Sequence, residues 1–167
     1  LIDSKTGEQV HIDFGIAFDQ GKTLTMPEVI PFRLSRDVID GMGCAGTRGA
    51  FFSSSVDCMS ELRQNYQALT TILDVLIHDP LYRWMLTPGD ASRFQREGDS
   101  QSDRESAAPP DNQAAERALF RVKQKLQGYS DTTHDALSVE GQVTHLIAEA
   151  TDRDNLCVLF PGWSPWL

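Results

Sequence analysis

The sequence predicts a mainly helical α+β fold that begins with a short β-hairpin. Apolar residues recur at alternating spacings of three and four from Val56 to Ile77, which is the periodicity of a long amphipathic helix. Two short strand-like runs, LID and QVHID, flank the segment SKTGE, whose Ser, Gly and Lys are typical of a hairpin loop. The remaining apolar residues group into further helical patterns separated by polar stretches.

The hairpin is followed by a loop and a short helix. Periodicity is absent from residue 15 to residue 31, and Gly21, Pro27 and Pro31 break any regular element there. Ser35 is predicted to cap a short helix that the glycines at 41 and 43 end. Its apolar side chains are predicted to face inward: Val38, Ile39 and Met42.

The long helix is predicted to run from residue 56 to residue 77. Asp57 or the serines before it can cap its start, and Asp79-Pro80 ends it because proline disfavours helical geometry in the preceding residue. The stripe spans only about three heptads, the minimum for a coiled coil, so a core helix is the better interpretation. The stripe consists of Met59, Leu62, Tyr66, Leu69, Leu73 and Leu76.

Composition changes after this helix. Residues 88–113 hold a single large apolar residue, so we expect disorder or a mobile insertion. A helix follows that ends at Gly128, and Ser138 opens a last helix before an aromatic tail that we expect to dock on the protein. The first helix has one face of Ala115, Leu119, Val122 and Leu126, and the second has one of Val139, Val143, Leu146, Ile147 and Ala150.

Composition and charge exclude several classes of function. Hydrophobic residues make up 40% of the chain and charged residues 23%, which is typical of a soluble globular protein, and no apolar run is long enough to cross a membrane. A formal charge of -9 argues against non-specific binding to nucleic acid. No cationic cluster accompanies the tryptophans of the tail, so direct membrane binding is not expected.

Three cysteines, Cys44, Cys58 and Cys157, are far apart and lack the spacing of a zinc site. We predict that they are buried, reduced thiols, since an odd number of distant cysteines does not suit a disulfide framework. The first residue, Leu1, is not Met and begins in mid-strand, so we expect a C-terminal piece of a longer chain.

Chemistry is predicted where Asp13, Phe14 and Gly15 end the second strand-like run. A carboxylate is a hard oxygen ligand for magnesium bound to nucleotide phosphates, an aromatic ring anchors the strand end, and glycine permits a sharp turn into a loop. Three residues alone equally fit an ordinary strand that meets a turn.

The continuation of this motif decides between the two readings. Residues 11–51, HIDFGIAFDQGKTLTMPEVIPFRLSRDVIDGMGCAGTRGAF, closely resemble the segment after the catalytic loop of the phosphatidylinositol 3-kinase-related protein kinases. Residues 135–167 resemble the FATC segment of the same family, and DVIDGMG with LFPGW looks most like the ATM branch, which includes the fungal telomere-maintenance kinases. The resemblance divides the chain into a partial kinase C-lobe (1–87), a regulatory insertion (88–134) and a FATC domain (135–167).

Carried over by position, the resemblance implies that Asp13 is a catalytic residue and a ligand of Mg²⁺, with Mn²⁺ as an alternative, and that Asp13, Phe14 and Gly15 contribute to the ATP site. His11 is expected to be structural. The catalytic loop is expected to precede Leu1, so the fragment alone is expected to be inactive. Residues 16–35 are expected to form the activation and substrate loop, including Ile16, Phe18, Gly21, Lys22, Pro27, Glu28, Pro31, Phe32 and Arg33.

The function implied by the resemblance is that of a serine/threonine protein kinase. It would phosphorylate Ser/Thr-Gln sites in DNA damage signalling and telomere maintenance, in the nucleus at chromosomes and telomeres. Its expected partners are protein substrates, a DNA-break sensor complex, the rest of its own kinase domain and, in the full-length protein, a second copy. Two alternatives remain: a catalytically dead scaffold of the same family, and a lipid kinase. The loop from Ile16 to Ile30 has only one cation, Lys22, which disfavours an anionic lipid headgroup.

Overall fold

The computed structural model describes residues 3–8, 10, 16–24, 26–76, 112–130 and 135–163. The helical character of the fold is confirmed, and within these residues no strand is present. The α-helices are α1 (Arg36–Gly41), α2 (Ala50–Gln64), α3 (Tyr66–Leu76), α5 (Asn112–Leu126), α6 (Val139–Thr151) and α7 (Arg153–Leu156). The 3-10 helices are η1 (Gln20–Thr23), η2 (Gly43–Arg48) and η4 (Pro161–Trp163).

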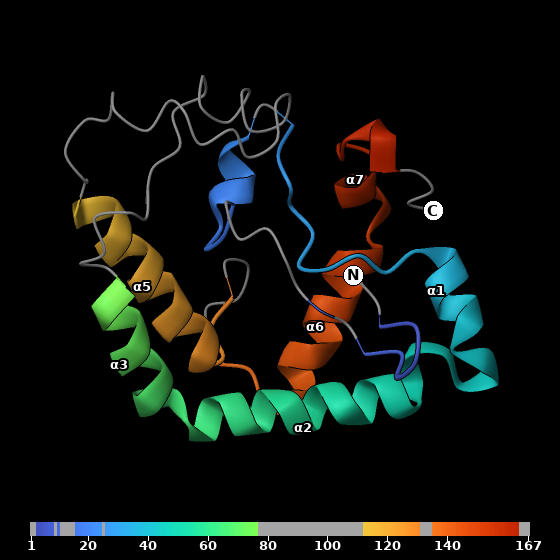
Figure 1. Ribbon diagram of the computed structural model, residues 1–167, viewed down its shortest axis with the longest axis horizontal. Helices are drawn as coiled ribbons and strands as arrows, with labels where there is room; N and C mark the ends of the chain where they lie inside the picture. The colour runs from blue at the N-terminus through green and yellow to red at the C-terminus, as the bar shows by residue number, and fades with distance from the viewer. Residues whose placement is uncertain are drawn as a thin grey trace.

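In Figure 1, helix α2 runs along the bottom of the view, and the other helices lie above it or near its ends. Helix α6 packs against α2, and α3 lies beside α5 near the C-terminal end of α2. Helix α7 follows α6 at the end that lies farther from α2. Within the described ranges, no helix combines the length and the apolar character needed to cross a membrane.

The predicted β-hairpin is not seen among the described residues, and most residues of both strand-like runs lie outside the described ranges. The part that is described, residues 3–8, forms a turn. Asp3 and Glu8 are joined by a hydrogen bond of 2.9 Å from the Asp3 N–H to the Glu8 carbonyl. The Asp3 carboxylate accepts hydrogen bonds from the backbone N–H groups of Thr6 and Lys5, which lower the pKa of Asp3. SKTGE is therefore a turn that the preceding residue, Asp3, holds through its carboxylate, with Gly7 at a φ of 74°.

The predicted single helix of residues 56–77 is wrong in its start and its continuity. Helix α2 begins at Ala50, with Gly49 and not Asp57 at the N-cap. The serines before residue 56 fit inside the helix, because the Ser55 hydroxyl donates to the Phe51 carbonyl at 2.7 Å. The helix breaks at Asn65, whose side-chain amide donates to the Glu61 carbonyl at 2.8 Å and competes with the backbone for that acceptor.

The prediction that this segment is a buried core helix is also wrong for α2, which has no fully buried side chain. Leu62, a member of the predicted stripe, is 37% exposed. Burial requires a second surface, and among the described residues mainly α6 and η2 pack against α2. The three cysteines, predicted to be buried, are all exposed, although they are free thiols as predicted.

Helix α1 has the predicted start, since Ser35 occupies its N-cap with an extended backbone. The Ser35 hydroxyl makes no capping hydrogen bond, and its carbonyl accepts from Ile39 N–H at 3.1 Å. The prediction that Val38 faces inward is wrong, because Val38 is 46% exposed. A helix of six residues is too short to define a face by periodicity.

Both C-terminal helices are present: α5 ends before Gly128 and α6 begins after Ser138, as predicted, while α5 starts at Asn112, inside the stretch 88–113 that is predicted to be disordered. Ala115 and Leu119 of α5 are buried, as are Val143 and Ala150 of α6. Ser138 caps α6 by accepting a hydrogen bond from the Gly141 N–H at 3.0 Å. Helix α7 is capped in the same way by Asp152, which accepts from the N–H groups of Asp154 and Asn155. Local signals therefore define these elements.

Candidate functional site

The residues predicted to bind the metal and the nucleotide, Asp13, Phe14 and Gly15, lie outside the described ranges, as does His11. Their roles stay predictions. Among the residues that the structure does describe, no group of three His, Cys, Asp or Glu side chains could hold a metal ion. The described part of the candidate site is therefore the loop that runs from Ile16 to the start of α1.

The first half of this loop is compact and conformationally strained. Leu24 is 5% exposed and packs with Ile16, while η1 turns the chain between them. Phe18 and Asp19 have positive φ angles of 54° and 67°, a conformation that costs an L-residue about 1 to 2 kcal/mol. Two consecutive residues of this kind persist only where neighbouring groups hold them in place.

The loop then folds back on itself at Gly21. The Gly21 carbonyl accepts from the N–H of Leu24 at 3.3 Å and from that of Glu28 at 2.9 Å. A Cβ atom at Gly21 would lie 3.1 Å from the Glu28 carboxylate, so the close approach favours glycine. Lys22, Glu28, Pro31 and Arg33 are exposed, and Pro27 is half-buried. The predicted loop residues thus form a folded surface segment with several charged groups at its surface.

Asp19 connects this loop to helix α5. Its carboxylate lies 3.0 Å from Lys125 Nζ and 3.9 Å from Arg121 Nη1, both on α5, and 4.0 Å from Lys22 Nζ. The Asp19 side chain is only 15% exposed, so it is less screened than a fully exposed carboxylate. No sequence pattern predicts this contact, although the spacing of Arg121 and Lys125 places two cations on one helix face.

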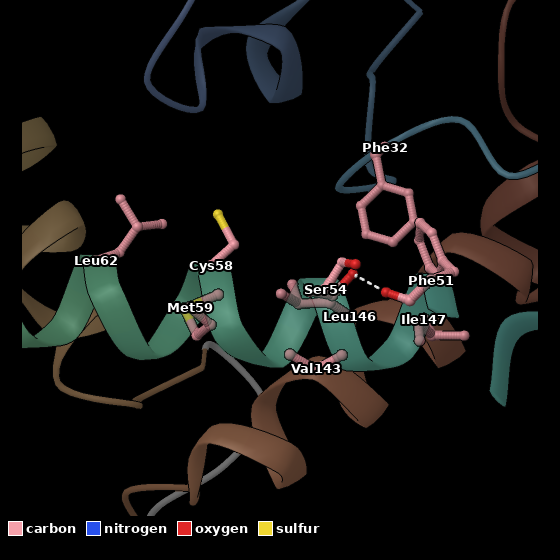
Figure 2. Close-up of a pocket in the computed structure, with 10 residues that line it drawn as sticks. Phe32, Phe51, Ser54, Cys58, Met59, Leu62, Val143, Leu146 and Ile147 are labelled. Carbon is pink, nitrogen blue, oxygen red and sulfur yellow. Dashed lines mark hydrogen bonds between the residues drawn. The ribbon is translucent and has the colours of Figure 1, made fainter. Parts of the chain in front are cut away.

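The second half of the loop packs against α2. The rings of Phe32 and Phe51 lie edge to face, with centroids 6.1 Å apart. Beside them is an apolar groove of about 380 Å³ between α2 and α6. Figure 2 shows Phe32, from the predicted activation loop, and three residues of the FATC segment along this groove: Val143, Leu146 and Ile147. The groove therefore brings the loop and the FATC segment to the same helix.

Arg63 of α2 binds the FATC segment through a set of hydrogen bonds. Its guanidinium donates to the Gln142 side-chain oxygen at 2.6 and 3.2 Å and to the Leu137 carbonyl at 3.0 and 3.1 Å. Gln142 is 5% exposed, and its Nε2 donates to the Lys125 carbonyl at 2.8 Å. These bonds join α2, the end of α5 and the start of α6.

The end of α5 is a Schellman motif centred on Gly128. Tyr129 N–H donates to the Gln124 carbonyl at 3.0 Å, and Gly128 N–H donates to the Lys125 carbonyl at 3.1 Å. Gly128 has a φ of 94° and is buried against the Arg63 guanidinium and the Leu137 carbonyl. Gly128 ends the helix as predicted, whereas its close approach to Arg63 and Leu137 has no signal in the sequence.

Ser130 lies close to His145 and Glu149 of α6, but the three side chains do not have the geometry of a hydrolytic triad. His145 Nε2 lies 2.8 Å from Ser130 Oγ and 3.3 Å from Glu149 Oε1. In a triad the serine and the acid contact opposite ring nitrogens, so that the acid orients the base. Here both contact the same nitrogen, which favours a structural role.

Comparisons with known proteins agree with the resemblance. The family model described as phosphatidylinositol 3- and 4-kinase matches residues 1–86, and the model of the FATC domain matches residues 136–167. Kinases of this kind in general use ATP and a divalent metal ion.

The curated relatives are much longer proteins. Serine/threonine-protein kinase ATM is 46% identical in Arabidopsis thaliana and in Drosophila melanogaster, and each match covers 100% of this chain but only 4% and 6% of the relative. Serine/threonine-protein kinase TEL1 of Saccharomyces cerevisiae is 41% identical over 99% of this chain and 6% of its own length.

The solved structures show the same fold. The FAT and kinase domain of CtTel1 matches with a TM-score of 0.77 and 40% identity, over 99% of this chain and 10% of that chain. The complete CtTel1 dimer with C2 symmetry matches equally well over 5% of its chain. The family model covers more than half of the sequence, and a FATC match follows it in the expected order. This chain therefore belongs to the phosphatidylinositol 3- and 4-kinase family, in the branch of the ATM and TEL1 kinases.

Proposed function

We propose that the protein containing this chain is an ATP-dependent serine/threonine protein kinase of the ATM and TEL1 type. The observation that carries the proposal is the 46% identity to kinases of this name across the whole chain. Its substrates are proteins with Ser/Thr-Gln sites, and its role lies in DNA damage signalling and telomere maintenance in the nucleus.

Within this protein, Asp13 binds Mg²⁺, or Mn²⁺ as an alternative, at the ATP phosphates, while Phe14 anchors the strand end and Gly15 permits the turn into the loop. The carboxylate fits the group chemically, because magnesium prefers hard oxygen ligands. When bound, ATP would supply the phosphoryl group, and the metal ion would offset the negative charge of its phosphates. The loop of residues 16–35 positions the protein substrate.

Charge favours a protein substrate over a phosphoinositide. A phosphorylated headgroup requires Arg or Lys donors, but residues 16–30 offer only Lys22 against the carboxylates of Asp19 and Glu28. Lys22 Nζ also lies 4.0 Å from the Asp19 carboxylate, which reduces its attraction for a further anion.

The division into a partial C-lobe (1–87), a regulatory insertion (88–134) and a FATC domain (135–167) is part of the same proposal. The full-length kinase works as a homodimer with a DNA-break sensor complex. The homodimer is supported by the likeness to the CtTel1 dimer with C2 symmetry. The contacts of Lys125 and Arg121 with Asp19 support a regulatory role for α5, because they join the insertion to the activation loop.

Replacing Asp13 with Asn in the full-length kinase is expected to lower kcat at least about 10²- to 10³-fold, because a neutral amide binds the metal ion less strongly. The measurement is phosphate transfer from ATP to a Ser-Gln peptide, to the same peptide with Gln replaced by Ala, and to phosphatidylinositol vesicles. We expect transfer to the Ser-Gln peptide above all, and none from the isolated 167 residues.

The matched control is Asp37→Asn, which removes an equal charge from the exposed first turn of α1. It is expected to leave kcat unchanged. Full activity of the Asp13→Asn variant, or transfer to the vesicles in preference to the peptide, would contradict the proposal.

A further inference from the structure

Lys125 contacts two other elements through different parts of one residue. Its side-chain Nζ lies 3.0 Å from the Asp19 carboxylate of the loop, and its backbone carbonyl accepts a 2.8 Å hydrogen bond from Gln142 Nε2 of α6. The two contacts are remote in sequence, and they meet in the last turn of α5, where the Schellman motif fixes the backbone.

Gln142 is held in one orientation by its neighbours. Arg63 can only donate hydrogen bonds, so the amide oxygen of Gln142 must face the guanidinium, and its NH₂ group is turned toward the Lys125 carbonyl. The side chain is 5% exposed, so a polar end without a partner would carry a desolvation cost. Gln142 therefore fixes where the last turn of α5 lies relative to α2 and α6.

The conformation of the loop depends on the cations that the end of α5 places beside it. Asp19 and Phe18 hold positive φ angles that are unfavourable for residues with side chains. The Asp19 carboxylate faces two cations of α5, Lys125 at 3.0 Å and Arg121 at 3.9 Å. These attractions act on a side chain that is 15% exposed, and they offset part of the backbone strain.

We propose that Gln142 is a positioning residue for the activation loop and that it acts through Lys125. The FATC helix orients the last turn of α5 through the Gln142 amide, and that turn holds Asp19 and the strained start of the loop. This inference deepens the proposed kinase function. Only the activity measurement described below depends on that function.

The test uses hydrogen exchange in the full-length protein, read at backbone amides of residues 16–24, so that it does not depend on catalysis. Lys125→Met removes the cation but keeps the backbone contact, and we expect roughly two- to fivefold faster exchange in this segment. Lys125→Arg keeps a cation and is expected to retain the slow exchange. Lys123→Met is the matched control, because Lys123 contacts Asp74 of α3, at 3.8 Å, and not the loop.

Gln142→Glu separates the two contacts of Gln142. The carboxylate still accepts from Arg63 but cannot donate to the Lys125 carbonyl, so we expect faster exchange in residues 16–24 while α6 stays protected. If Gln142 acts through Lys125, the double variant with Lys125→Met exchanges no faster in this segment than Lys125→Met alone. Additive effects, or equal effects of Lys123→Met and Lys125→Met, would overturn the proposal.

Activity provides a second readout. Lys125→Met and Gln142→Glu are each expected to raise the KM for a Ser-Gln peptide about threefold or more. The KM for ATP is expected to stay unchanged, because the loop and not the nucleotide is displaced. An equal rise in both constants would refute the positioning role. A wild-type protein that transfers no phosphate would refute the proposed function, while the exchange measurements would still decide the role of Gln142. Should Gln142→Glu lose α6 protection as well, the Lys125 variants decide the outcome, because Lys125→Met, Lys125→Arg and Lys123→Met all leave the hydrogen bonds of Arg63 in place.

Discussion

Replacing Arg63 with Met is expected to detach the start of α6 from α2, at a cost of about 2 to 4 kcal/mol in local opening free energy. The Leu137 carbonyl and the Gln142 oxygen both lose their donors from Arg63, while Met fills a similar volume without replacing a hydrogen bond. Hydrogen exchange of the α6 amides in the full-length protein measures the effect, which corresponds to roughly 30- to 1,000-fold faster exchange.

Two further variants separate the effect of the planar guanidinium of Arg63, which donates to two acceptors, from the effect of its charge. Arg63→Lys keeps the charge but cannot reach both acceptors with a planar group, so it is expected to recover less than half of the protection. Arg48→Met removes an exposed arginine from η2 and is expected to change the free energy by less than about 0.5 kcal/mol. Unchanged α6 exchange in Arg63→Met would show that the apolar contacts of α6 hold it alone.

Replacing Gly128 with Ala is expected to cost about 3 kcal/mol or more at the same junction. Part of this is the left-handed backbone, at a φ of 94°, which costs about 1 to 2 kcal/mol for a residue with a side chain. The rest is collision, because the new Cβ would lie 2.6 Å from the Leu137 carbonyl oxygen and 2.7 Å from Arg63 Nη2. The effect is measured by the exchange rates of α5 and α6 amides.

Gly43→Ala is the matched control, since Gly43 has a similar φ of 76° but nothing within 4 Å of its added Cβ. It is expected to show the conformational cost alone, about 1 kcal/mol. Asn, which tolerates the left-handed region, is expected to rescue position 43 and to fail at position 128. Equal effects of alanine at the two positions would contradict the role assigned to the collision.

Sequence reasoning found the elements whose causes are local. Ser138 and Gly128 lie within a few residues of the helices that they cap or end, so their chemistry can be recognised without a structure. The family motif around Asp13 is likewise contiguous. The break at Asn65 was missed for an energetic reason: the apolar stripe continues on both sides of it, and only the side-chain bond to the Glu61 carbonyl reveals the interruption.

The contacts that organise the candidate site join residues far apart in the chain. Arg63 reaches a carbonyl 74 residues away, and Lys125 reaches a carboxylate 106 residues away. No periodicity or spacing encodes such pairs, because each partner alone looks like an ordinary surface residue. The exposure of the α2 stripe could not be predicted either, since burial depends on which surfaces pack against a helix.

The Schellman motif and the Leu137 N–H bond to the Gly128 carbonyl, 2.9 Å long, have a consequence for chain length. They hold the two ends of the connection between α5 and α6 together, independently of the residues between them. Lengthening a loop with fixed ends costs only about 0.6 kcal/mol for each doubling. A longer connection between these two fixed ends, for example one that carries a short epitope tag, is therefore expected to leave the Arg63 junction intact.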